Sequence, residues 1–230
     1  MLIEPVASPR VVDLGCGDGR LTATLHERLH ASRTLGVDSS AAMLSRATAH
    51  ATESVSFEET DIGGWRSDGE DIVFSNAALH WVSDHAAVLE RWSAGLGPGA
   101  QLAVQVPANA DHASHIIAAE LASDWLGSAA PPDPVAEHVL APEAYAELLD
   151  RLGFDRQHVR LQIYPHRLDS SADVVEWVKG TSLTRFKAIL DPVDYELFVE
   201  EYRRRLLAVL GGRSPYLYTF KRILCWGRRP

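Results

Sequence analysis

A glycine-rich segment near the start of the chain has the composition of a ligand-binding loop. It reads Val11-Val-Asp13-Leu-Gly15-Cys16-Gly17-Asp-Gly19, with three glycines at every second position after an acid. Glycine adopts positive φ and leaves no Cβ between the backbone and a ligand. The spacing is not the G-x-G-x-x-G of dinucleotide-binding loops, and Asp13 would repel a pyrophosphate. The segment therefore indicates either a ligand with an ammonium group or a plain strand–turn–helix connection.

Further polar residues follow later apolar runs. Asp38 ends the run 34–38 and offers two oxygens to the hydroxyls of a ribose. Asp61 can accept from the exocyclic amine of a purine, and Ile62 beside it supplies a backbone N–H and an apolar contact. Asn76 ends the run 71–75. In α/β proteins ligands bind where the carboxyl ends of parallel strands meet, so these residues together predict a pocket for an ammonium, a ribose and an adenine.

Short apolar runs alternate with helical patterns in the first hundred residues. We expect strands over 10–14, 34–38, 54–58, 71–75 and 101–106, with helices between them, one capped by Ser39 or Ser40. This alternation predicts an α/β fold with a doubly wound, mostly parallel sheet. The remainder predicts helices over 113–125, 142–152, 172–179 and 191–210, and strands over 158–165 and 216–226. We expect a single domain, 1–230, with helical cap segments at about 110–150 and 172–210.

Charge and composition exclude several classes of protein. Of the 230 residues, 46% are apolar and the net charge is −9, with 22 acids against 7 Lys and Arg in residues 1–150. Such an acidic surface disfavours nucleic acid as a partner. No run approaches the roughly 18 apolar residues of a membrane helix, and the start lacks the features of a signal peptide. Two distant cysteines form no disulfide framework, so we expect a cytoplasmic protein with no membrane partner.

Several motifs together resemble those of a known family. They are Asp13-Leu-Gly-Cys-Gly-Asp-Gly19, Asp38-Ser-Ser-Ala-Ala-Met43, Thr60-Asp-Ile62, Ser75-Asn-Ala-Ala-Leu-His-Trp81 and Glu176-Trp-Val-Lys-Gly-Thr181. The chain resembles class I S-adenosylmethionine (SAM)-dependent methyltransferases, and more narrowly trans-aconitate 2-methyltransferase and its relatives. The resemblance implies a Rossmann-like seven-stranded sheet with an antiparallel last strand, and SAM as the cofactor.

The same resemblance implies a set of cofactor-binding residues. Asp13, Gly15 and Gly17 lie at the methionine end of SAM, Asp38 on the ribose and Asp61 at the adenine. The other cofactor-binding candidates from these motifs are Cys16, Ser39, Met43, Ile62 and Asn76.

The expected reaction is O-methylation of a small carboxylic acid similar to trans-aconitate. A carboxylate acceptor is ionised at neutral pH and needs no base, whereas a hydroxyl acceptor would, with His80 as the candidate catalytic residue. We expect Trp81 and Trp177 to wall the acceptor pocket. Arg185 and Arg222 are candidates for binding the unreacted carboxylates, because the guanidinium fork matches them.

Other interpretations stay open. Compared with relatives, the chain differs at His80, at Pro107-Ala-Asn109 and at Ser182-Leu-Thr-Arg185, all near the expected acceptor pocket. The acceptor can therefore be another small hydroxylated metabolite. Alternatively, the chain is a SAM-binding protein of little activity, because the helical lid segment that precedes the first strand in relatives is absent. A nicotinamide oxidoreductase fits the glycine spacing less well.

Two histidine pairs raise the question of a metal site. The pairs His26/His30 and His112/His115 have ligand-like spacing, but no thiol or carboxylate nearby in the sequence completes either set, so no metal is expected. We expect a monomer or a homodimer.

Overall fold

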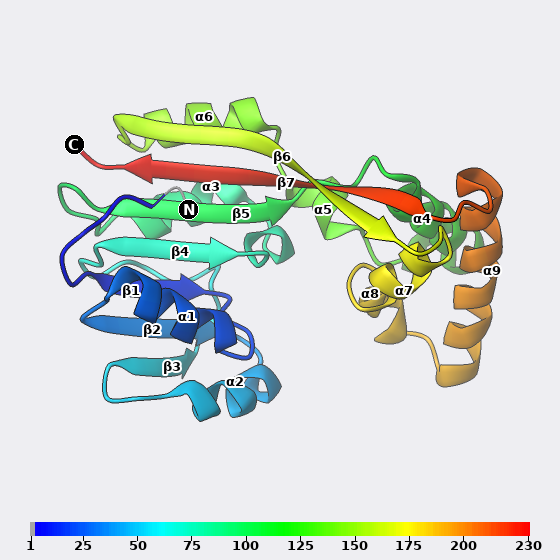
Figure 1. Ribbon diagram of the computed structural model, residues 1–230, viewed down its shortest axis with the longest axis horizontal. Helices are drawn as coiled ribbons and strands as arrows, with labels where there is room; N and C mark the ends of the chain where they lie inside the picture. The colour runs from blue at the N-terminus through cyan, green and yellow to red at the C-terminus, as the bar shows by residue number, and fades with distance from the viewer. Residues whose placement is uncertain (1–2) are drawn as a thin grey trace. The chain divides into compact units, whose positions relative to one another are not determined.

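The structure, a computed structural model, describes residues 3–230, which divide into two compact units (Figure 1). Unit 1 contains the described residues up to 107 together with 138–162 and 223–230. Unit 2 contains 108–137 and 163–222. The single domain that the sequence indicates stays a prediction.

A seven-stranded sheet forms the centre of unit 1, although residues 163–168 and 216–222 of its two longest strands are part of unit 2. Its order is β3-β2-β1-β4-β5-β7-β6, and β3, β2, β1, β4 and β5 are paired in parallel, as the alternating pattern predicts. β7 runs against its neighbours β5 and β6, which confirms the antiparallel last strand (Figure 1). The strands are β1 (Arg10–Leu14), β2 (Arg33–Asp38), β3 (Val55–Glu59), β4 (Ile72–Asn76), β5 (Gln101–Pro107), β6 (Arg156–Leu168) and β7 (Tyr216–Arg228).

Apolar residues cover both faces of the central strands. Val11 and Val12 point to opposite faces of β1, and both are buried. Leu25 of α1 (Arg20–Leu29) packs with Val11 on one face. In α3 (His85–Ser93), the buried indole of Trp92 donates to the carbonyl of Ile62 at 2.8 Å. Burial on both faces is what a parallel sheet requires, and it explains why these strands read as continuous apolar runs.

Helix α6 (Pro142–Arg151) belongs to unit 1. The sequence pattern groups this segment with the helical cap, and that grouping stays a prediction. Its buried Tyr145 hydroxyl lies 2.6 Å from Nδ1 of His85 on α3, and both side chains belong to unit 1. Pro142 begins the helix at its first position, as expected.

Unit 2 is mainly helical and has its own apolar core. Val178, Phe186, Phe198 and Tyr202 are buried there together with residues of α4. Asp191 caps the long helix α9 by accepting hydrogen bonds from two backbone N–H groups of its first turn. The helices are α4 (Ala113–Leu126), α5 (Pro134–His138, its last residue in unit 1), α7 (Asp173–Lys179), α8 (Thr184–Lys187) and α9 (Pro192–Leu210).

The predicted elements all occur, with shifted ends. β6 extends beyond the expected 158–165, and the short helices α5 and α8 are additional. None of the helices in residues 3–230 combines the length and the apolar character needed to cross a membrane. That the helical segments cap one end of the sheet stays a prediction.

Candidate active site

The glycine loop after β1 is tied to the end of β2. The backbone N–H groups of Gly15 and Cys16 both donate to the carbonyl of Val37, at 2.7 and 2.9 Å. Gly15 has φ of +79°, and a Cβ at this position would lie 2.1 Å from Cβ of Ala78. Only glycine fits here, because both the backbone conformation and the neighbouring side chain exclude any other residue.

Gly17 faces open space at the centre of the loop. Its φ is +57°, and a Cβ built there would meet no atom within 4 Å. Packing therefore does not require a glycine at this position. A bare, accessible stretch of backbone is what a closely approaching ligand needs, so the loop fits the cofactor that its sequence predicts.

Asp38 joins the glycine loop to the start of α2 (Ala41–Ala47). One carboxylate oxygen accepts from the N–H of Gly17 at 2.9 Å, and the other accepts from Ser40 at 2.9 Å. Each carboxylate oxygen can accept further hydrogen bonds, so the group remains suited to two ribose hydroxyls. Of the two serines that the sequence offers as caps, Ser40 caps α2, and Ser39 is exposed. Met43 on α2 is 38% exposed.

Asp13 is buried below the loop. Thr22 of α1 donates to its carboxylate at 2.6 Å, and only 2% of the residue is exposed. Burial raises the pKa of Asp13 to about 6, against the opposing hydrogen bond from Thr22. Burial together with the charge of Asp13 likewise raises the pKa of the Cys16 thiol to about 12, so this cysteine is an unreactive packing residue.

The remaining cofactor candidates follow β3 and β4. Asp61 is exposed, and its carboxylate accepts from the N–H of Gly63 at 3.0 Å. Ile62 is buried, and Asn76 is the last residue of β4. Because β1, β2, β3 and β4 are parallel, their carboxyl ends lie along one edge of the sheet. The structure thus brings the predicted cofactor residues to the same edge of unit 1.

His80 and Trp81 lie in unit 1, in the short 3₁₀ helix after β4 (Leu79–Trp81). The His80 residue is 7% exposed, and its ring centre is 4.8 Å from that of Trp81, which is 54% exposed. The carbonyl oxygen of His80 lies 3.1 Å from Nδ1 of His138. Trp81 thus presents an exposed aromatic face beside a buried imidazole.

The expected acceptor residues of the C-terminal half belong to unit 2. Trp177 packs against His166, with 4.6 Å between ring centres, and against Phe220 at 6.0 Å. The guanidinium of Arg222 lies 5.2 Å from the centre of the same Phe220 ring. Trp177 and Arg222 therefore share one aromatic neighbour.

Arg185 has a different environment. It lies on α8, its side chain is 7% exposed, and its Nη1 is 3.2 Å from a carboxylate oxygen of Asp133.

Sequence patterns did not single out several residues that hold these groups. Thr22 fixes Asp13, and both Asp133 and His115 accompany Arg185, with 2.7 Å between Asp133 and Nδ1 of His115. The ligand-like spacing of His112 and His115 is the one sequence signal at this place, and on sequence grounds no metal is expected there. Within residues 3–230 no group of three or more His, Cys, Asp or Glu side chains is placed to hold a metal ion.

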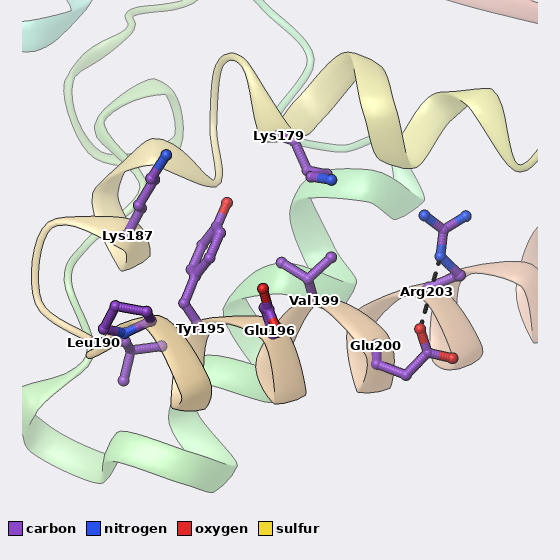
Figure 2. Close-up of a pocket in the computed structure, with 9 residues that line it drawn as sticks. Lys179, Lys187, Leu190, Tyr195, Glu196, Val199, Glu200 and Arg203 are labelled. Atoms are coloured by element: carbon purple, nitrogen blue, oxygen red, sulfur yellow. Dashed lines mark ion pairs between the residues drawn. The ribbon is translucent and has the colours of Figure 1, made fainter.

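A groove of about 570 Å³ lies on unit 2 beside α7, α8 and α9 (Figure 2). Lys179 and Arg203 line it, but both form ion pairs with Glu176, at 3.1 and 2.7 Å. Arg203 also lies 4.0 Å from Glu200, an ion pair drawn in Figure 2. Glu176 and Glu200 thus offset the charges of Lys179 and Arg203, while Lys187 is a further cation that lines the groove.

Comparison with known proteins identifies the class of protein to which this chain belongs. Residues 11–99 match the model of a methyltransferase domain family. Trans-aconitate 2-methyltransferase of Deinococcus radiodurans is 42% identical over 96% of this chain and 87% of its own length. The enzyme of the same name from Streptomyces avermitilis is 38% identical over 93% of this chain and 82% of its own.

Solved structures agree on the fold. The YcgJ protein of Bacillus subtilis matches with a TM-score of 0.63 and 18% identity, over 98% of this chain and 94% of that chain. Phosphoethanolamine N-methyltransferase 2 of Haemonchus contortus, solved with S-adenosyl-L-methionine, matches with a TM-score of 0.60 and 17% identity, over 97% of this chain and 49% of that chain. The chain is a class I SAM-dependent methyltransferase. Within that class, it belongs to the trans-aconitate 2-methyltransferase family.

Proposed function

We propose that this enzyme methylates one carboxylate of trans-aconitate or of a closely similar small polycarboxylic acid. The observation that carries the proposal is the 42% identity to the Deinococcus radiodurans enzyme over 96% of this chain.

The glycine loop and the strand ends of unit 1 are proposed to hold SAM. Gly17 gives the ligand access to the backbone, and Asp38, fixed by Gly17 and Ser40, is oriented to accept from the ribose hydroxyls. Asp61 is proposed to accept a hydrogen bond from the exocyclic amine of the adenine, and Ile62 to contact the ring and donate its backbone N–H. Asp13 supplies negative charge for the ammonium group, in ionised form above its raised pKa of about 6.

The reaction needs alignment more than acid–base catalysis. When bound, SAM would supply an electrophilic methyl group on its sulfonium sulfur for transfer to a carboxylate oxygen, and the sulfur would leave as the neutral thioether. The residues of the chain must therefore orient the acceptor and exclude water, which contributes up to about 7–11 kcal/mol in well-aligned cases. Because the acceptor carboxylate is already ionised, there is no proton for His80 to remove. His80 is therefore proposed to help place the acceptor and not to act as a base.

Ester formation tests the proposal directly. Purified protein is incubated with methyl-labelled SAM and trans-aconitate, and products are identified by mass spectrometry. We expect one labelled monomethyl ester for each S-adenosylhomocysteine formed, and no labelled product from the fully esterified acid. Label transferred only to hydroxylated acids, or S-adenosylhomocysteine at the level of the protein-free control, would contradict it.

A further inference from the structure

A cleft of about 240 Å³ on unit 1 is lined by three arginines, Arg10, Arg33 and Arg66, and is called the arginine cleft below. Arg10 and Arg33 are the first residues of β1 and β2, and other lining residues come from the segment 65–70 before β4. The residues proposed to hold SAM follow the carboxyl ends of the same parallel strands. Because a strand rises about 3.3 Å per residue, the length of β1 separates the arginine cleft from the proposed cofactor site.

Two of these arginines are neighbours across the sheet. Arg10 and Arg33 are register partners in the parallel pair of β1 and β2. Neighbouring strands lie about 4.8 Å apart, so two cationic side chains begin side by side. Like charges in such a position repel each other. An anion bound between the two guanidinium groups would turn this repulsion into attraction.

The acids near the arginine cleft do not form ion pairs with its arginines in the part of the chain that the structure describes, residues 3–230. The carboxylate of Asp71 accepts from the backbone N–H of Arg10 at 2.7 Å, and that of Glu70 accepts from the backbone N–H of Asp68 at 2.7 Å. Asp68 and Glu70 line the arginine cleft, so two acids face three cations. The arginine cleft therefore keeps a net positive charge.

Backbone carbonyls orient the guanidinium of Arg10. Its Nη1 donates to the carbonyl of Gly69 and its Nη2 to that of Asp68, each at 3.3 Å. Gly69 has φ of +79°, a conformation that favours glycine. Carbonyl groups fix the guanidinium without cancelling its charge. The exposed side chains of Arg33 and Arg66 form no hydrogen bond with any described residue, so their donors remain available to a ligand.

The size and the walls of the arginine cleft limit the ligand. Val11 is buried, and Leu35 and Trp65 are half-buried, so they add apolar and aromatic surface. The volume is below the roughly 300–1,000 Å³ of sites for drug-sized ligands, which favours a small molecule. Guanidinium forks match phosphate oxygens, and a phosphate monoester carries a charge of about −1.5 to −2 at neutral pH. One phosphate group can therefore neutralise more of the cluster than one carboxylate can.

We propose that the arginine cleft binds a small phosphate monoester. The phosphate group lies between the guanidinium groups of Arg10, Arg33 and Arg66, and the organic group contacts the indole of Trp65. This site goes beyond the proposed function, because its ligand is neither the methyl donor nor the methyl acceptor. Its occupation does not depend on whether the chain methylates an acid.

Isothermal titration calorimetry with phenyl phosphate tests the site. The protein is saturated with S-adenosylhomocysteine, so that phosphate binding at the proposed cofactor site does not contribute. We expect one phenyl phosphate per wild-type chain. The double variant Arg33→Gln/Arg66→Gln should raise Kd roughly 10- to 100-fold, because charged hydrogen bonds are lost. An unchanged Kd in this variant, or no binding by wild type, overturns the proposal.

The matched control is Arg46→Gln/Arg151→Gln. It removes two exposed arginines of unit 1 that do not line the arginine cleft, and so it makes the same change in net charge. The control should keep the wild-type Kd. A loss of affinity as large as that of Arg33→Gln/Arg66→Gln shows that phenyl phosphate responds only to overall charge, and this also overturns the proposal. Thermal unfolding checks that each variant is folded.

Two further probes test the chemical class of the ligand. Malonate, a small dicarboxylate, should bind at least about tenfold more weakly than phenyl phosphate, and equal or tighter binding contradicts the assignment to phosphate. Inorganic phosphate tests the organic group. Trp65→Leu should weaken phenyl phosphate and leave inorganic phosphate unchanged. If inorganic phosphate binds wild type as tightly as phenyl phosphate does, the contact with Trp65 is contradicted and the ligand is the free ion.

Discussion

The carboxylate of Asp38 accepts a hydrogen bond from the backbone N–H of Gly17 at 2.9 Å, which joins the end of β2 to the glycine loop that follows β1. The two residues are 21 positions apart in the chain. The parallel pairing of β1 with β2 brings them together and so prepares two parts of the proposed SAM site at once. Preorganisation of this kind lowers the ordering cost of binding.

Two glycine substitutions should separate folding from ligand binding. Gly15→Ala should lower the free energy of unfolding strongly, because the new methyl group would lie 2.1 Å from Cβ of Ala78. Gly17→Ala meets no atom and should cost only about 1–2 kcal/mol for its left-handed backbone. The second variant should nevertheless bind SAM more weakly. Urea unfolding and calorimetry check both, and equal stability losses in the two variants would refute the distinction.

Asp13 should make stability fall as pH rises. Its pKa is raised by burial from 3.8 to about 6, so protonation favours the folded state, and the benefit is lost between about pH 4 and pH 6. Two pKa units correspond to about 3 kcal/mol. Asp13→Asn should equal wild type near pH 4 and exceed it in unfolding free energy at pH 7 by up to about that amount. Chemical denaturation across this range checks the sign; a constant difference at all pH values would contradict it.

His80 should not act as a base for a carboxylate acceptor. His80→Ala is expected to keep kcat for trans-aconitate within about tenfold, below the 10²–10⁴ typical of a lost general base. The pH–rate profile should keep its shape. Loss of a titrating limb from that profile in the variant would show that His80 transfers a proton.

The pair Asp133 and Arg185 should contribute little to stability. Buried ion pairs replaced together by residues of similar volume are often neutral or stabilising by about 1–4 kcal/mol. We therefore expect the double variant Asp133→Asn/Arg185→Met to unfold at a urea concentration no lower than wild type. A loss of stability above about 3 kcal/mol would indicate a structural role instead.

Local patterns predicted the sheet and the loop because both depend on short segments. The alternation of apolar runs with helical patterns predicts the five parallel strands that the structure contains. The glycine spacing predicts positive φ angles, and the structure has them at Gly15, Gly17 and Gly19. The amphipathic pattern of α6 showed that one face is buried but not against which element. Its partner His85 is 60 residues away from Tyr145, and no local signal connects them.

The acceptor side was harder to predict for the same reason. Arg185 was identifiable as a cation suited to carboxylates, but Asp133 is 52 positions earlier, and His115 another 18. An isolated acid after two prolines resembles a surface loop, and only folding makes it a buried group. The contacts that decide whether a cation is free for a ligand are long-range, so sequence patterns alone leave them open.

Calorimetric titration of SAM into wild type and Asp38→Ala tests the central claim that the glycine loop and Asp38 form the cofactor site. We expect one SAM bound per wild-type chain. Loss of charged hydrogen bonds worth about 1.5–3 kcal/mol should raise Kd in the variant by roughly 10- to 100-fold. Equal affinity in the two proteins, or no SAM binding by wild type, would contradict the account.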